Sequence, residues 1–182
     1  MTNNNDCSGV SYGTKHSRPR LMMNVDALSA EERAYLLGLF LTDGDLTRVK
    51  YSARVHFSLA NSEVELAERV SGFLRRLGLR SDINDYSGVR NYVVVRAYGV
   101  GLLSYFPDKK QLISLDDSAL EKWLSCQGLY GDLGIPFIAG LLDGDGYVSA
   151  SYDRESIFPC VEVCWSFAQK KLGCLIDFIV DY

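Results

Sequence analysis

The sequence has little of what would place it in several common classes of protein. No uninterrupted apolar run approaches the ~20 residues that a membrane-spanning helix needs. The opening segment "MTNNNDCSGVSYGTKHSRPR" lacks the apolar core of a secretory signal peptide. The five cysteines are odd in number and form no Cys-x-x-Cys pair, and only two histidines could join them in a zinc site. These absences predict an intracellular protein in a reducing setting, in the cytoplasm or an organelle, that is neither secreted nor membrane-bound.

An overall excess of basic residues is also lacking. The 182-residue chain has a net charge of −4, which argues mildly against nucleic-acid binding if charge is averaged over the whole molecule. A hydrophobic content of 47% is enough to bury a substantial core in one compact body or two small ones. The placement of charge along the chain therefore carries more information than the sum.

Two segments about a hundred residues apart share an unusual pattern. "YLLGLFLTDG" ends at Gly44 and "FIAGLLDGDG" ends at Gly146, so each apolar run closes on an Asp-Gly pair. A capping box of Ser29 and Glu32 predicts a helix over the first run, and Pro136 suits the first turn of a helix over the second. Strand-like alternation follows each run, at Val55, Phe57 and Leu59 and again at Val163, Trp165 and Phe167. The repetition indicates an internal duplication.

Between the two copies the pattern predicts further regular structure. Helical spacing behind a second capping box, Ser62 and Glu65, predicts a helix within 62–79, and a hairpin is expected around Ser87-Gly88. Short helices are expected within 99–106 and 117–128. The predicted fold class is α+β, a duplicated αββαββα arrangement with antiparallel sheets. We expect a polar tail over 1–25, a first repeat over 26–128, and a second, incomplete repeat over 129–182.

Small residues give the two predicted motif helices a way to pack closely. They stand four apart on one face of each helix, as Gly38 and Thr42 in the first and Gly140 and Gly144 in the second. Packing along these faces would place Asp43 and Asp145 side by side at two helix carboxyl ends, where negative charge is disfavoured. A hard divalent cation such as Mg²⁺ would offset this repulsion and could activate water for phosphodiester hydrolysis.

An EF-hand calcium loop is a weaker explanation of the second Asp-Gly segment. In "DGDGYVSASYDR", Tyr147 stands where the loop needs Asp or Asn, Val148 where it needs glycine, and Arg154 where it needs a bidentate Glu. Asp45 and Asp143 also lie near the motif ends, and we interpret them as turn or helix-end carboxylates.

The paired motifs resemble those of LAGLIDADG homing endonucleases of the single-chain, two-repeat kind. The resemblance implies a saddle-shaped, intron-homing endonuclease whose antiparallel sheets lie in the major groove of a long double-stranded DNA site, with Mg²⁺ or alternatively Mn²⁺ as cofactor. By position it implies metal ligation by Asp43 and Asp145, with the carbonyls of Gly44 and Gly146 near the metals. Asn61 and Gln169 match the place of polar residues that order the attacking water, and Lys170 is a candidate for a role near the cleaved phosphate.

Local charge agrees with a DNA-binding sheet. No acidic residue lies between Leu46 and Asn61, whereas basic side chains recur along this stretch and the later hairpin. Arginine can pair bidentately with guanine, and Arg or Lys contacts to phosphate give a salt-dependent affinity. The candidate DNA-binding residues are Arg48, Lys50, Arg54, His56, Ser58, Arg80, Arg90 and Arg96.

Two departures from the family pattern leave alternatives open. The family often has a basic helper near the end of the fourth strand, but "RAYGVG" offers only Arg96 nearby. The second repeat also lacks a final hairpin and helix, as expected of a fragment, a naturally shortened enzyme, or a monomer that a second chain would complete as a dimer. A non-cleaving nucleic-acid-binding module, such as an intron-splicing maturase, is the alternative function. An intein is disfavoured because no splicing-type opening residue or terminal His-Asn is present.

Overall fold

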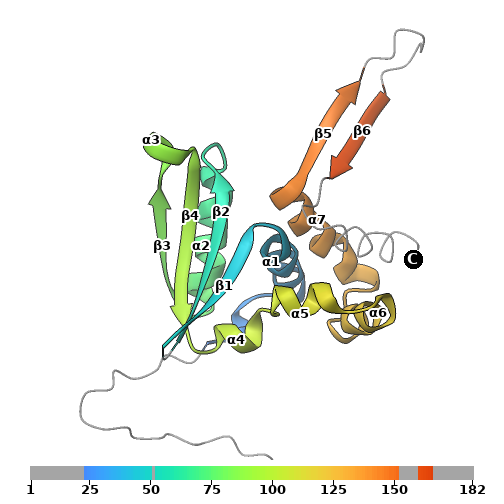
Figure 1. Cartoon of the computed structure of the whole chain (residues 1–182), viewed down its shortest axis with the longest axis horizontal. Coiled ribbons are helices and arrows are strands. Elements are labelled where there is room, and N and C mark those ends of the chain that lie inside the picture. The colour runs from blue at the N-terminus through green and yellow to red at the C-terminus, as the bar shows by residue number, and fades with distance from the viewer. Residues whose placement is uncertain (1–22, 51, 152–159, 166–182) are drawn as a thin grey trace, which may run out of the picture.

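The computed structural model describes residues 23–50, 52–151 and 160–165. A four-stranded antiparallel sheet lies on one side of a central pair of helices, and a two-stranded hairpin lies on the other (Figure 1). The predicted α+β fold class, with helices and antiparallel sheets, is confirmed. Most of the tail expected over 1–25, and the last part of the second repeat, lie outside the described residues.

The chain order follows the predicted alternation of helices and strands. The first part contains η1 (Val25–Ala27), α1 (Ala30–Asp43), β1 (Gly44–Val49), β2 (Ser52–Ala60), α2 (Val64–Arg76), β3 (Arg80–Asp85), α3 (Ser87–Arg90) and β4 (Tyr92–Gly99). Three short helices then lead toward the second motif helix: α4 (Leu102–Tyr105), α5 (Lys109–Ser114) and α6 (Asp117–Cys126). The final part contains η2 (Gly131–Leu133), α7 (Gly134–Asp145), β5 (Gly146–Ser151) and β6 (Cys160–Trp165).

The four-stranded sheet has the order β1-β2-β4-β3, with every neighbouring pair antiparallel. In β2 the alternation predicted from the sequence is confirmed, because Val55, Phe57 and Leu59 are buried while the intervening residues are half-buried or exposed. The buried side chains join one core with residues from α1, α2 and α4 to α7. One face of the sheet is therefore committed to packing, which leaves the other available for function.

One local prediction was wrong, and another is confirmed. The capping box of Ser29 and Glu32 is present at the start of α1, but α2 begins at Val64 and shows no side-chain cap from Ser62. The Glu63 carboxylate instead accepts a hydrogen bond from the Ala60 N–H at 2.8 Å, which fixes the turn between β2 and α2. The hairpin expected around Ser87-Gly88 is confirmed, because β3 pairs antiparallel with β4, and the helical turn α3 connects the two strands.

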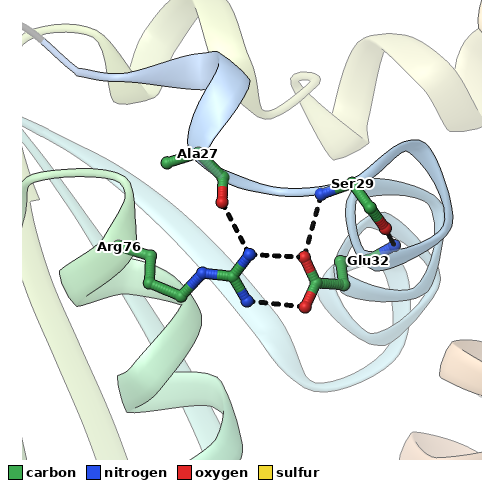
Figure 2. A network of polar contacts seen from close by, with 4 residues as sticks. All are labelled: Ala27, Ser29, Glu32 and Arg76. Carbon is green, nitrogen blue, oxygen red and sulfur yellow. Dashed lines mark hydrogen bonds and ion pairs between the residues drawn. The ribbon is translucent and has the colours of Figure 1, made fainter.

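Figure 2 shows how the beginning of α1 is tied to the end of α2. The Arg76 guanidinium donates to both Glu32 carboxylate oxygens, at 2.6 and 2.8 Å, and to the Ala27 carbonyl at 2.6 Å. Glu32 also accepts from the Ser29 N–H at 2.8 Å, which completes the capping box. The hydrogen bond from Arg76 and that from Ser29 lower the pKa of the Glu32 carboxyl below its usual range.

This network predicts a pH-dependent contribution to stability. A carboxyl whose pKa is lowered by folding stabilises the protein above its unfolded pKa, and that stabilisation is lost as the pH falls. We expect Glu32→Gln to lower the melting temperature at pH 7 by about 2–4 °C, and the difference from wild type should shrink between about pH 5 and pH 3. Thermal unfolding of Glu68→Gln, an exposed site on α2, is the control. A Glu32→Gln effect as large at pH 3 as at pH 7 would contradict this account.

None of the helices in the described part of the chain is both long and apolar enough to cross a membrane.

Candidate active site

The two motif helices, α1 and α7, pack with their backbones in direct contact. A Cβ atom added to Gly38 would lie 2.1 Å from the Phe137 carbonyl oxygen, and one added to Gly140 would lie 2.0 Å from the Tyr35 carbonyl oxygen. The two contacts are equivalent: Gly140 stands in the second motif where Gly38 stands in the first, and Phe137 where Tyr35 stands. Asp145 corresponds to Asp43 at the same separation along the chain. Only glycine permits this approach, as expected from the small residues of the motif. The pair therefore forms a symmetric crossing of the two motif helices.

The crossing brings the carboxyl ends of α1 and α7 together. Asp43 ends α1 and Asp145 ends α7. A Cβ on Gly144, next to Asp145, would lie 1.9 Å from the Thr42 hydroxyl and 3.1 Å from an Asp43 carboxylate oxygen. The structure thus places the two motif carboxylates at one site, as their sequence positions predict.

Both carboxylates are disfavoured in their charged forms. Burial is the main cause that raises the pKa of Asp43 to about 7, and the neighbouring charges of Asp145 and Glu63 add to the rise. Burial also raises the pKa of the Asp145 carboxyl above its usual range. Opposing this, the Lys109 ammonium lowers the pKa of both groups. A site that holds two partly buried carboxylates this close is one that a cation would stabilise.

Lys109 is the basic residue of the site that sequence reasoning missed. It begins α5, and its ammonium donates a hydrogen bond to the Thr42 carbonyl oxygen at 3.0 Å, at the end of α1. The same nitrogen lies 5.4 Å from the centroid of the Phe40 ring. Burial lowers the pKa of Lys109, while Asp43, Asp45 and Asp145 raise it. The ammonium therefore faces the motif carboxylates from a third element of the fold.

No sequence signal adjacent to the motifs could have located Lys109. It lies far along the chain from Asp43 and reaches α1 only because α4 and α5 fold back beside β1 (Figure 1). The family pattern places a basic helper near the end of the fourth strand, which here is β4 and ends at Gly99. The sequence does indicate a helix start at this place, because Asp108 caps α5 through the Lys110 and Gln111 N–H groups. It does not indicate that Lys109 reaches the motif carboxylates.

The remaining predicted residues of the catalytic site lie next to the motif aspartates, in an exposed turn, or outside the described residues. Gly44 and Gly146 begin β1 and β5, so their backbones directly follow the two motif aspartates. Asn61 is exposed in the turn after β2, where its N–H donates to the Asn91 carbonyl at 3.2 Å. Gln169 and Lys170 lie outside the described residues. Within the residues that the structure describes, no three His, Cys, Asp or Glu side chains converge on one metal-binding position.

The two nearby carboxylates, Asp143 and Asp45, have partners within the protein. Asp143 accepts a hydrogen bond from the Tyr35 hydroxyl at 2.5 Å and lies 4.0 Å from the Arg69 guanidinium. Asp45 accepts from the Thr47 hydroxyl at 2.9 Å and lies 3.6 Å from His56 Nδ1. These contacts agree with their interpretation as structural carboxylates and distinguish them from Asp43 and Asp145.

The predicted DNA-binding side chains are divided between several places. Strand pairing puts Arg54, His56, Ser58, Arg80 and Arg96 on the sheet face opposite the core, which we call the open face. Lys50 lies in the turn between β1 and β2, and Arg90 lies in α3 at one end of the sheet. Arg48 alternates with Thr47 and so belongs to the other face of β1, where it lines a groove of about 490 Å³ together with Lys109 and Lys110.

The open face is mixed in charge, not uniformly basic as the sequence suggested. One cross-strand row consists of Asp45, His56, Arg96 and Asp82, with an acidic residue at each end. The next row consists of Thr47, Arg54, Tyr98 and Arg80. Asp82 was overlooked because β3 does not alternate clearly in sequence, and it lies 3.7 Å from Arg80.

Comparison with known proteins agrees with this architecture. Residues 30–106 match the model of the LAGLIDADG-like domain. They span α1 to α4 and include the first motif aspartate. The chain therefore carries a LAGLIDADG-like domain, and the resemblance found in the sequence is confirmed. A search of curated proteins finds none with significant similarity to this chain.

Solved structures share the fold at low sequence identity. A double mutant of I-SmaMI superposes with a TM-score of 0.51 at 13% identity, over 82% of this chain and 72% of that one. The LAGLIDADG homing endonuclease I-GzeII, in complex with its DNA target, has a TM-score of 0.44 at 12% identity over 71% of this chain. The N-terminal LAGLIDADG domain of DUF199/WhiA has a TM-score of 0.47 at 19% identity, over 90% of this chain and 71% of that one. The match to I-GzeII covers 64% of the I-GzeII chain, so this chain spans less than two thirds of that protein's length.

Proposed function

We propose that this protein is a metal-dependent DNA endonuclease of the homing type, encoded within an intron and acting inside the cell. The single observation that carries the proposal is the meeting of Asp43 and Asp145 where α1 and α7 end, with Lys109 facing them. Two half-buried carboxylates at helix carboxyl ends destabilise the fold electrostatically, which is characteristic of a site maintained for chemistry.

The carboxylates fit a hard divalent cation. Mg²⁺ is commonly held by one or two carboxylates together with water and substrate phosphate oxygens. Asp43 and Asp145 would hold the ion, and Mn²⁺ is the alternative to Mg²⁺. The backbone carbonyls of Gly44 and Gly146, the next residues along the chain, would lie near it. When bound, such an ion supplies a Lewis acid for the phosphate and lowers the pKa of water.

The chain's own side chains would position the reactants. In hydrolysis, water adds to phosphorus and the bond to one ester oxygen breaks, so negative charge grows on the phosphate oxygens and the leaving oxygen. The ammonium of the half-buried Lys109 faces the carboxylates and is placed to offset this charge. Asn61 and Gln169 are the candidates for ordering the attacking water, and Lys170 for a contact near the cleaved phosphate.

Double-stranded DNA is the proposed partner. The arginines of the open face could contact base edges in the major groove, while Lys50, Arg90 and the groove containing Arg48 could contact phosphates. The fold's I-GzeII neighbour was solved with its DNA target, which supports this choice of partner. We propose a monomer with two motif helices in one chain, and a dimer only if a second copy completes the DNA-binding surface.

Cleavage of a randomised duplex library tests the proposal. The purified 182-residue chain would be incubated with the library and Mg²⁺ or Mn²⁺, and new DNA ends would be sequenced. We expect staggered double-strand breaks at one recurrent sequence, absent when EDTA is added. Specific binding without breaks would instead favour the non-cleaving alternative, such as an intron-splicing maturase. If the chain neither binds nor breaks the DNA, the proposal is refuted for this chain.

Replacing Lys109 tests its predicted part in the reaction. Methionine has nearly the length of lysine but no charge, so Lys109→Met removes the ammonium that faces the carboxylates. The variant should slow cleavage by about 10–100-fold while changing DNA affinity by less than about threefold. Single-turnover cleavage and DNA-binding titrations measure the two effects.

The neighbouring lysine provides a matched control. Lys110 is exposed, whereas Lys109 is half-buried. Lys110→Met should therefore weaken DNA binding slightly through its loss of a surface charge and leave the cleavage rate of bound DNA unchanged. Equal rate losses in the two variants would show that Lys109 acts only as a general positive charge.

A further inference from the structure

We propose that Arg96 reads a base pair of the DNA target and that Tyr86 is the positioning residue that holds its guanidinium for this purpose. The inference rests on the proposed DNA-binding function of the open face and names one side chain that would give that face sequence selectivity.

Arg96 is held more firmly than the other arginines of the open face. Its Nη2 donates to the Tyr86 hydroxyl at 3.1 Å, and its guanidinium carbon lies 5.7 Å from the centroid of the Tyr86 ring. Tyr86 is itself packed against Tyr92, with ring centroids 5.3 Å apart. By comparison, the contact of Arg54 Nη2 with the Thr47 hydroxyl is 3.5 Å long. An aromatic ring and a hydrogen bond therefore fix the plane of the Arg96 guanidinium.

The burial of Val94 supports this arrangement. Val94 lies between Tyr92 and Arg96 on the open face, but only 3% of its surface is exposed and it does not belong to the main core. Side chains of the open face must therefore cover it. The contacts with Tyr86, beside this covered patch, restrict the arginine side chain, and less side-chain entropy is then lost on binding.

A guanidinium fixed in this way suits guanine recognition. Arginine has five N–H donors, and the Tyr86 hydroxyl accepts from only one nitrogen, so a bidentate pair to guanine O6 and N7 can still form. The position is central, because Arg96 pairs with His56 on β2, which pairs with Asp45 at the start of β1. Two strand spacings amount to about 10 Å. The recognised base pair should therefore lie within a few base pairs of the cleaved bond.

Selection of bound sequences from a randomised duplex library tests this inference. Binding would be measured without divalent metal, so that cleavage does not interfere. At one base pair near the cleavage position, wild type should prefer guanine, and Arg96→Ala should reduce that preference by about 5–150-fold. Tyr86→Phe keeps the ring but removes the acceptor, and should reduce the preference at the same base pair by about 3–10-fold.

Two further variants separate base reading from other roles. Arg96→Lys keeps the charge but loses the planar fork that Tyr86 holds, so it should retain less of the guanine preference than of the overall affinity, whereas a phosphate contact would be kept in full. Tyr98→Phe, on the exposed next row, should leave the preference unchanged. A uniform loss of affinity across all sequences in Arg96→Ala, or an unaltered profile in both Arg96→Ala and Tyr86→Phe, would overturn the inference while leaving DNA binding intact. A wild-type protein that selects no sequence would instead refute the proposed function.

Discussion

Asp43→Asn should abolish metal-dependent DNA cleavage and, in the absence of metal, make the protein more stable. The loss of a carboxylate ligand removes several kcal/mol of transition-state charge stabilisation, so we expect cleavage to fall by at least about 10³-fold. The stability gain follows because Asp43 is half-buried beside Asp145, with its pKa raised to about 7. A raised carboxyl pKa means that ionisation destabilises the fold as the pH rises. At pH 8 the gain should be about 1–2 kcal/mol, or about 2–8 °C in melting temperature.

Asp143→Asn is the matched control for this prediction. Asp143 lies in the last turn of α7, close to Asp145, but it accepts a hydrogen bond from Tyr35 and lies near Arg69. Its replacement removes the ion pair with Arg69 and leaves a neutral, weaker acceptor for the Tyr35 hydroxyl, so it should lower stability slightly and leave cleavage largely intact. If Asp43→Asn retained wild-type cleavage, or if both substitutions changed stability in the same direction, the assignment of Asp43 to the metal site would be wrong.

Gly140→Ala should have the largest effect on stability of any single methyl addition in the described structure. The added Cβ would lie 2.0 Å from the Tyr35 carbonyl oxygen and 2.8 Å from the Leu39 nitrogen, both backbone atoms that cannot rotate away. Relief requires separating α1 from α7, at a cost of more than about 3 kcal/mol. Because the same crossing holds Asp43 next to Asp145, metal affinity should fall together with stability.

Gly72→Ala separates this steric effect from the general consequences of replacing a helical glycine. Gly72 lies inside α2, and apart from its chain neighbours and the backbone of its own helix no heavy atom lies within 4 Å of the position that its Cβ would take. Alanine there should stabilise the protein by about 0.4–1 kcal/mol, because it restricts the unfolded chain. Chemical denaturation of both variants measures the difference. A Gly140→Ala variant as stable as Gly72→Ala would show that the helices are not in the predicted contact.

The elements that the sequence predicted well are those in which the signal is local. The capping box of Ser29 and Glu32 and the alternation of Val55, Phe57 and Leu59 depend only on neighbouring residues, and both appear in the structure. The helix crossing was also accessible, because small residues four apart predict the close face of a helix without knowledge of its partner. For the same reason, the meeting of Asp43 and Asp145 followed from the motifs alone.

The features that the sequence did not predict depend on tertiary packing or on competing local choices. Lys109 reaches the site across the fold, and Tyr86 reaches Arg96 along the face of a hairpin, so neither contact has a signature in chain spacing. The start of α2 differs because the Glu63 carboxylate binds the Ala60 N–H in place of the predicted Ser62 cap. The face of Arg48 follows from the pleat of a strand, which puts neighbouring residues such as Thr47 and Arg48 on opposite faces, although exposure in β1 does not alternate clearly.

Titration of the protein with Mn²⁺, followed by electron paramagnetic resonance of the free ion, tests most directly whether the two motif helices share a metal site. The account predicts that wild type binds Mn²⁺ and that either Asp43→Asn or Asp145→Asn alone removes most of this binding, because both carboxylates hold the same position. Asp143→Asn should bind as wild type does. Mn²⁺ binding that survives both single substitutions, or that is lost equally in Asp143→Asn, would contradict the central claim that the crossing of α1 and α7 builds the catalytic metal site.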